Sequence, residues 1–379
     1  MRAKAHPPVV PGTRVAVLGA GSWGTTFAKI LADGGADVVL WARRPELARE
    51  ISEGRRNSDY LPGINLPAHL RATSSLRDAL AGAGQVFVSV PSQSLRENLV
   101  AAGDLLDPEA VIVSLMKGVE RSSGLRMSEV IGQVLPIAPE RIAAISGPNL
   151  ALEIAKEQPT AAVVSSASLE TAQAVAKLAT NGYFRSYVNT DVIGTEFGGV
   201  LKNLIAVAIG IVDGVGYGEN TKASIITRGL VEMTDFAVAY GAQPETLAGL
   251  AGLGDLIATS QSPLSRNNTA GRLLGQGYGY NDVVKQMQQT TEGLVSVGPI
   301  LELAHAKGVE MPIVEQVRQV LAGTLNPRDI APHLTTDSRE PQGERTIDDG
   351  QAHGGAALWG AFKRAFDQLR DGGRGPRGA

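Results

Sequence analysis

The chain has 379 residues, enough for two domains, and its 35 basic and 38 acidic residues give a net charge of −3. This balance argues against a protein dedicated to nucleic acid or to an anionic membrane surface, because both need a basic excess. The absence of cysteine excludes disulfides and thiolate metal sites, and the five histidines are scattered, so we expect no metal centre.

The beginning of the chain and its apolar runs bear on localisation. The opening "MRAKAHPPVVPG" lacks the apolar core of a signal peptide. The run "LIAVAIGIV" is far shorter than the roughly 20 residues that a membrane span needs. We therefore expect a cytoplasmic protein without stable membrane insertion.

The first half of the chain alternates short apolar runs with helical patterns. Continuous apolar strands separated by helices are typical of a parallel sheet that is covered on both faces. After a flexible N-terminus at 1–12, we therefore expect an α/β Rossmann-like domain with a mostly parallel sheet over 13–192. The runs that predict its strands are "RVAVLGAG", "DVVLWAR", "QVFVSVP", "VIVSLMKG", "RIAAISGPN" and "AAVVSS".

The pattern changes near Asp191, after which one helical segment follows another. We expect an all-helical domain over 193–334, with breaks at Gly241, Gly254 and Gly308. The polar, glycine-rich stretch that follows predicts a mostly disordered tail over 335–379. Within that tail, "ALWGAFKRAFDQLRD" allows a short helix at 357–371.

A glycine-rich turn follows the first expected strand directly and opens a helix. Gly19, Gly21 and Gly24 have the G-x-G-x-x-G spacing of a dinucleotide-binding turn. In such a turn the glycines permit a tight bend, a close approach to the pyrophosphate and close helix packing. The amides of Ser22 and Trp23 would then face the phosphates at the helix N-terminus. This context predicts a nicotinamide dinucleotide cofactor.

The end of the second expected strand bears on which dinucleotide is bound. NAD-preferring folds place an acidic residue here, but this chain has Ala42 followed by Arg43 and Arg44. Arginine suits the 2′-phosphate of NADP(H). The sequence therefore favours NADP(H), with NAD(H) as the alternative.

Three further segments carry polar residues at positions that suit a site. Lys117 ends an apolar strand, so it would lie at the carboxyl edge of the sheet unless it is merely solvated there. Gly147 begins a strand-to-helix turn that offers free amides. Asp255 is a carboxylate in an apolar run, and the segment 265–267, Ser-Arg-Asn, could either hold a phosphate or simply start a helix.

One ammonium group lies inside a nearly apolar stretch, 195–214. Lys202 has aliphatic residues on both sides, and a buried charge is costly unless it is paired. On the residues alone, Lys202 is either a functional group or a lysine that reaches solvent from a helix edge.

Taken together, these segments resemble the bacterial type of NAD(P)-dependent glycerol-3-phosphate dehydrogenase. They occur in the order typical of that family and cover roughly 15–320. The matching segments are "GAGSWGT", "SLMKGVE", "SGPNLA", "GGVLKNLIAVAIGIVDGVGYGENTKASIITRGL", "AGLGDLIATSQSPLSRN" and "TTEG".

The resemblance implies reversible reduction of dihydroxyacetone phosphate to sn-glycerol 3-phosphate, which supplies the backbone of glycerophospholipids, and it implies a homodimer. Lys202 falls on the family's proton acceptor, and we expect Asp255 to be its catalytic counter-charge. No side-chain role is carried onto Asn149, where the family often has a small hydroxyl residue. With the turn glycines, the expected cofactor-binding residues are Gly19, Gly21, Ser22, Trp23, Gly24, Arg43, Arg44, Lys117, Ala151, Arg266, Thr290 and Glu292; the expected substrate-binding residues are Lys117, Gly147, Lys202, Asp255, Ser265, Arg266 and Asn267.

Two alternatives stay open on the sequence. One is another two-domain NADP-dependent reductase with a helical second domain, of the 2-hydroxyacid, ketopantoate or 6-phosphogluconate type. The other is a non-catalytic protein that senses NADP(H). Such a sensor should lack Lys202, Asp255 or Arg266, and this chain has all three.

Overall fold

The computed structural model describes residues 14–287 and 291–330, and these residues form one compact unit. The segments expected to be a flexible N-terminus, a disordered tail and a helix at 357–371 lie outside the described residues. Thr290, an expected cofactor-binding residue, lies outside them as well.

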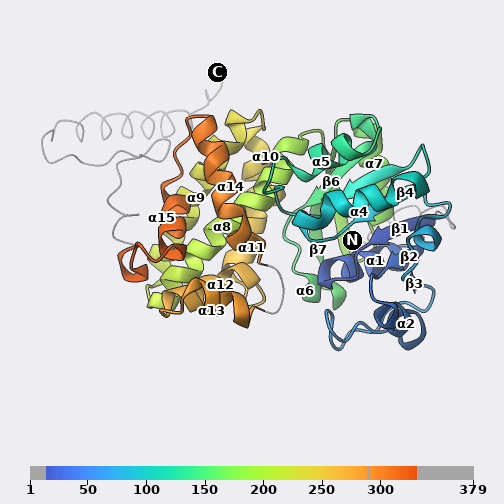
Figure 1. The fold of residues 1–379 in the computed structure, drawn as a ribbon, viewed down its shortest axis with the longest axis horizontal. Coiled ribbons are helices and arrows are strands. Elements are labelled where there is room, and N and C mark those ends of the chain that lie inside the picture. The colour runs from blue at the N-terminus through green and yellow to red at the C-terminus, as the bar shows by residue number, and fades with distance from the viewer. Residues whose placement is uncertain (1–13, 288–290, 331–379) are drawn as a thin grey trace, which may run out of the picture. The chain divides into compact units, whose positions relative to one another are not determined.

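An eight-stranded sheet forms the core of the first half, which confirms the expected mostly parallel α/β fold (Figure 1). The strand order is β3-β2-β1-β4-β5-β6-β7-β8, and only the pairing of β6 with β7 is antiparallel. Two strands at the edges of the sheet, β3 and β8, were not expected from the sequence. The strands are β1 Arg14–Leu18, β2 Asp37–Trp41, β3 Arg71–Thr73, β4 Gln85–Val88, β5 Val111–Ser114, β6 Ile142–Ser146, β7 Thr160–Ser166 and β8 Phe184–Asn189.

Both faces of the sheet are buried, because successive side chains of a strand point to opposite faces. Val15 and Val17 of β1 belong to a core that includes α1 and α7, whereas Ala16 and Leu18 belong to a second core that includes α4 and α5. The helices of this half are α1 Ser22–Asp33, α2 Pro45–Gly54, α3 Leu76–Leu80, α4 Leu95–Ala102, α5 Met127–Val134, α6 Ala151–Ala155 and α7 Leu169–Ala179.

The second half is helical and is organised around one long apolar helix, α8 (Figure 1). Asp191 caps the start of α8, because its carboxylate accepts a hydrogen bond from the Gly194 amide. Although α8 is long and apolar enough to cross a membrane, 83% of its most apolar window is buried inside the protein. The helices are α8 Val192–Val215, α9 Glu219–Ala239, α10 Pro244–Ala248, α11 Asp255–Gln261, α12 Arg266–Gly275, α13 Tyr280–Gln286, α14 Glu292–Ala306 and α15 Pro312–Leu321.

The expected break at Gly254 is wrong. A π-helical turn, Leu250–Gly254, continues directly into α11, and the backbone of Gly254 stays in the right-handed helical region. The helical stretch that contains α11 therefore begins earlier, after the extended Gly249, and the last residue of the turn immediately precedes Asp255. By contrast, Gly241 has a φ of 94° and lies just past the end of α9, as a helix-terminating glycine does.

Helices α8 and α12 approach each other until their backbones touch. A Cβ atom added at Gly210 of α8 would lie 2.2 Å from the carbonyl oxygen of Asn268 and 2.9 Å from the Cα atom of Gly271. Gly214 and Gly275 repeat this contact one turn further on. These four glycines therefore let main chain pack against main chain, with no side-chain layer between the two helices.

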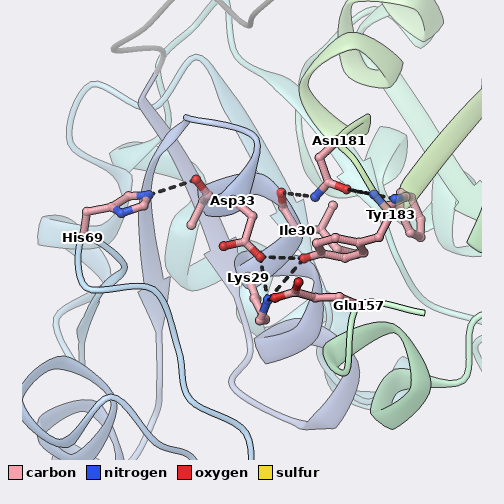
Figure 2. Close-up of polar contacts among 9 residues, drawn as sticks. Lys29, Ile30, Asp33, His69, Glu157, Asn181 and Tyr183 are labelled. Atoms are coloured by element: carbon pink, nitrogen blue, oxygen red, sulfur yellow. Dashed lines mark hydrogen bonds and ion pairs between the residues drawn. The ribbon is translucent and has the colours of Figure 1, made fainter. Parts of the chain in front are cut away.

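A second buried lysine, Lys29 of α1, shows how this fold neutralises a structural charge (Figure 2). Its ammonium lies 2.6 Å from the Asp33 carboxylate and 2.9 Å from the Glu157 carboxylate, and the Tyr183 hydroxyl donates to Asp33. Burial alone would lower the pKa of Lys29, but the two carboxylates outweigh it and raise the pKa. The cluster thereby ties α1 to the segment between α6 and β7 and to the start of β8.

We expect Gly210→Ala to lower the free energy of unfolding by about 1–3 kcal/mol, because the new methyl group would press on the backbone of α12. The matched control is Gly132→Ala in α5, where an added Cβ would make an ordinary contact, 3.6 Å from Ile142. Denaturant unfolding of both variants tests this expectation. Equal free energies of unfolding for the two variants would contradict this expectation, because they would show that α8 and α12 can move apart to accept the methyl group without loss of stability.

Candidate active site

The carboxyl ends of neighbouring parallel strands bring several of the expected site residues to one edge of the sheet. Gly19 follows β1, Lys117 follows β5 and Gly147 follows β6. Ser92, just after β4, lies on the same edge. A site can therefore be assembled here from segments that are far apart in the sequence.

The turn after β1 has the close packing that its glycines predict. Gly19 has a φ of 111°, and a Cβ atom at this position would lie 2.3 Å from the Ser89 carbonyl oxygen. A Cβ atom at Gly24 would lie 1.9 Å from the Gly19 carbonyl oxygen. Neither position accepts a side chain, so α1 begins tightly against the end of β1.

The N-terminus of α1 suits an anionic group. Gly21 is the N-cap, no side chain caps the helix, and no acidic residue lies in its first turn. A Cβ atom at Gly21 would meet nothing within 4 Å, so there is open space at the turn. The indole Nε1 of Trp23 is buried without a hydrogen-bond partner among the described residues. Uncapped amides beside open space fit the pyrophosphate of a dinucleotide.

The two arginines after β2 differ in their surroundings. Arg44 forms an ion pair with Asp59 at 2.5 Å and lies over the ring of Tyr60. Tyr60 is also connected to the turn, because its carbonyl oxygen accepts a hydrogen bond from the Ser22 hydroxyl. Arg43 is exposed, and no ion pair ties it to another described residue. Tyr60 was not expected in this region from the sequence.

Asp255 is the centre of a buried cluster that contains both expected lysines. The residue is only 1% exposed, and its carboxylate lies 2.6 Å from the Lys117 ammonium through Oδ2 and 3.0 Å from the Lys202 ammonium through Oδ1. Lys117 also donates to the Gly147 carbonyl oxygen. Lys202 donates to the Thr259 hydroxyl at 2.6 Å, and Thr259 donates to Asp255. One carboxylate is thus shared by two ammonium groups.

Thr259 is a member of this cluster that sequence reasoning missed. It lies one turn after Asp255 on α11, so the two side chains share a face of the helix. The spacing of four residues was the available signal, but a threonine on an apolar helix has no distinguishing pattern.

The charges of the cluster shift its pKa values in a definite direction. Burial is the main cause that lowers the pKa of Lys202 to about 8; the Lys117 and Arg266 charges act in the same direction, and Asp255 opposes them. Burial would raise the pKa of Asp255, but the two lysines outweigh it and hold that pKa below its usual value. The cluster therefore contains an ionised carboxylate and an amine that titrates close to neutral pH.

The N-terminus of α12 lies beside Lys202. Ser265 caps this helix, because its hydroxyl accepts a hydrogen bond from the Asn268 amide. Asn267 bridges two helices: its amide donates to the side chain of Asn203 on α8, and its oxygen accepts from the Gly293 amide on α14. Arg266, the first residue of α12, is exposed.

The remaining expected residues lie on the helices that border this edge. Glu292, at the start of α14, accepts hydrogen bonds from the hydroxyl and the amide of Ser92. Ala151, at the start of α6, accepts one from Thr26 of α1, which ties α6 to the helix of the glycine-rich turn. In the described residues, no hydrogen bond or ion pair links Arg43 to the lysine cluster.

Polar atoms near the cluster are buried without partners. The Ser146 hydroxyl and both side-chain polar atoms of Asn149 have no hydrogen-bond partner among the described residues. A buried polar group without a partner costs about 1–3 kcal/mol. These atoms, which flank Gly147, therefore favour a polar ligand at this turn.

Comparison with known proteins identifies the family of the chain. Residues 14–172 match the family model described as the N-terminus of NAD-dependent glycerol-3-phosphate dehydrogenase, and residues 191–332 match its C-terminus. The chain is 77% identical to the glycerol-3-phosphate dehydrogenase (NAD(P)+) of Leifsonia xyli, over 95% of this chain and 99% of that protein. A crystal structure of glycerol-3-phosphate dehydrogenase from Coxiella burnetii aligns with a TM-score of 0.82 at 35% identity, covering 86% and 99% of the two chains. A ketopantoate reductase from Ralstonia eutropha aligns with a TM-score of only 0.53 at 18% identity, over 85% and 99%, and shares the fold alone.

We expect Asp255→Asn to lower the free energy of unfolding by about 3–5 kcal/mol at pH 7, because two ammonium groups would lose their shared carboxylate. The depressed pKa of Asp255 means that its contribution is fully present at pH 7 and is lost only in acid. The loss in the variant should shrink above about pH 8, where Lys202 becomes neutral.

Denaturant unfolding between pH 6 and 10 measures this effect. Asp104→Asn, at an exposed position, is the control and should change the free energy by no more than about 0.5 kcal/mol. A loss of similar size in both variants would contradict a stabilising role for the shared carboxylate.

Proposed function

Because the chain belongs to the NAD-dependent glycerol-3-phosphate dehydrogenase family, we propose that it interconverts dihydroxyacetone phosphate and sn-glycerol 3-phosphate with a nicotinamide cofactor. The observation that carries the proposal is the buried Lys202 ammonium of α8. Asp255 and Thr259 hold it close to Lys117, which lies at the same edge of the sheet as the glycine-rich turn.

The cofactor would be held along the carboxyl edge of the sheet. The uncapped amides of Ser22 and Trp23 suit the pyrophosphate, and Glu292 and Ala151 border the same edge. When bound, the nicotinamide supplies the hydride that reduces the ketone. Arg43, which is exposed and has no ion pair in the described part of the chain, supports a preference for NADP(H) through its 2′-phosphate, with NAD(H) as an alternative.

Lys202 is the proposed proton donor in reduction and proton acceptor in oxidation. Reduction of a ketone builds negative charge on oxygen, which needs a proton and a nearby positive charge. An ammonium group has three donors. Thr259 and Asp255 accept two of them, and we assign the third to the substrate oxygen. A pKa of about 8 suits an amine that must both give and take a proton near neutral pH.

Lys117 and Asp255 would orient that proton donor and complete the substrate site. Lys117 holds the pKa of Asp255 down and so keeps it ionised, and its methylene stem and the unpaired Ser146 hydroxyl both lie next to Gly199. For the phosphate we propose Arg266, with the amides at the start of α12, because a guanidinium chelates phosphate through two parallel hydrogen bonds. Asn267 fixes that helix start against Asn203, the residue that follows Lys202.

The wider properties of the chain are also proposals. The division into domains at 13–192 and 193–334 is supported by β8 ending at Asn189 and α8 beginning at Val192, and by the boundaries of the two family matches. The family resemblance supports a cytoplasmic homodimer that supplies the glycerophospholipid backbone. The low similarity to the ketopantoate reductase disfavours the alternative reductase, and the intact lysine cluster disfavours a non-catalytic sensor.

A steady-state assay with dihydroxyacetone phosphate, with NADPH and NADH compared, tests the proposed reaction. We expect kcat for reduction to be level below pH 8 and to fall above it with a midpoint near 8, because only the protonated Lys202 can donate. The reverse oxidation should rise through the same midpoint. Lys202→Ala should lower kcat at least about a hundredfold and leave cofactor binding intact. Lys285→Ala, at an exposed helical position, is the control. A near-normal kcat for Lys202→Ala would rule out the role.

Substitution of the proposed phosphate ligand should separate substrate binding from chemistry. We expect Arg266→Lys to raise KM for dihydroxyacetone phosphate about tenfold or more, because an ammonium cannot form the paired hydrogen bonds of a guanidinium. The KM for NADPH should change less. Arg77→Lys, which changes an exposed arginine of α3, serves as the control. An unchanged KM for the ketone would place the phosphate elsewhere.

A further inference from the structure

Lys117 reaches the buried cluster by lying against α8 at a residue without a side chain. A Cβ atom added at Gly199 would lie 3.2 Å from Cγ and 3.4 Å from Cδ of Lys117, and 2.8 Å from the Ser146 hydroxyl. Optimal carbon–carbon contacts are about 3.5–4.0 Å. A Cβ atom at position 199 would therefore press on the Ser146 hydroxyl and would require the methylene stem of Lys117 to move by a few tenths of an ångström.

Gly199 lies in the middle of a long helix, where glycine is unfavourable by about 1 kcal/mol relative to alanine. Neither backbone strain nor a helix end accounts for it, because its backbone is helical and α8 continues for four more turns. Its neighbour Gly198 differs, since a Cβ atom there would lie 2.6 Å from the carbonyl oxygen of Ala251, which is main chain. At Gly199 only side chains are in the way, and both belong to the site.

We propose that Gly199 is a positioning residue for the reaction: it leaves room for the Lys117 stem, so that the Lys117 ammonium reaches Asp255 and the Gly147 carbonyl at the same time. This inference rests on the proposed function, because it assigns to Gly199 an effect on catalysis that passes through Lys117. A methyl group at position 199 would shift the Lys117 stem by a few tenths of an ångström, which would lengthen the contacts of its ammonium with Asp255 and the Gly147 carbonyl and so loosen the carboxylate that pairs with Lys202.

A displaced Lys117 ammonium should change the pH dependence of kcat, which a purely structural role of Gly199 would leave unchanged. Lys117 helps to lower the pKa of Lys202, so its displacement should raise that pKa. The falling limb of the kcat profile for ketone reduction would then move to higher pH. A change that only loosened the helix would lower kcat or stability without moving the midpoint in this direction.

The experiment compares Gly199→Ala with the control Gly132→Ala, a helical glycine that has room for a methyl group. With dihydroxyacetone phosphate and NADPH, we expect Gly199→Ala to keep the thermal midpoint of the wild type. Its kcat should be about ten- to a hundredfold lower, with the pH midpoint shifted upward. The control should match the wild type in kcat and in the pH midpoint, and its thermal midpoint should be equal or slightly higher. A folded Gly199→Ala enzyme with normal kcat and an unshifted midpoint would overturn the proposal.

A second comparison, made in the Lys117→Ala enzyme, tests whether the effect of Gly199→Ala on kcat passes through Lys117. In Lys117→Ala the stem is gone, so adding Gly199→Ala should change neither kcat nor, where turnover is too slow, the Kd for sn-glycerol 3-phosphate in the presence of NADP+. An equal loss in both backgrounds would overturn the proposal. If Gly199→Ala alone failed to fold, recovery of folding in the double variant would support it, and continued failure would contradict it. Absence of turnover by the wild type would instead contradict the proposed function.

Discussion

The site depends on one buried carboxylate that two ammonium groups share. Asp255 is almost inaccessible, and both of its oxygens are committed, one to Lys117 from the sheet edge and one to Lys202 from α8. Three segments of the chain therefore meet at the Asp255 carboxylate. The buried charge that each segment contributes would be unfavourable without its partners. The arrangement leaves a net positive charge in a buried place, which suits an anionic substrate and an oxygen that becomes negative during reaction.

Two buried lysines among the described residues have pKa values that are shifted in opposite directions. Lys29 has two carboxylates to itself, so its pKa is raised and it remains a fixed cation that braces α1. Lys202 shares one carboxylate with another lysine, so burial prevails and its pKa falls to about 8. The deeper burial of Lys202 and its smaller share of carboxylate therefore act together, and they distinguish it from the structural Lys29.

Sequence patterns predicted those features that local chemistry determines. The apolar runs, the glycine-rich turn and the isolated Lys202 are each visible within a few residues. The short strand Arg71–Thr73 and the edge strand Phe184–Asn189 were missed because neither forms a continuous apolar run. Thr259 and the role of Gly199 depend on partners that are remote in the chain, and no local pattern reports such contacts. For Arg44, the ion pair with Asp59 likewise became visible only in the fold.

The main-chain contact between α8 and α12 has a consequence for how the site adapts. Lys202 and Asn203 belong to one of these helices, and Arg266 and Asn267 belong to the other. Since Gly210 and Gly271 leave no intervening side chains to rearrange, the distance between Lys202 and the start of α12 cannot change easily. Accommodation of a ligand must then come from rotating side chains or from the α/β half. With Lys202 at the carbonyl and Arg266 at the phosphate, as proposed, a ketone with a longer carbon chain between these groups would not match both ends.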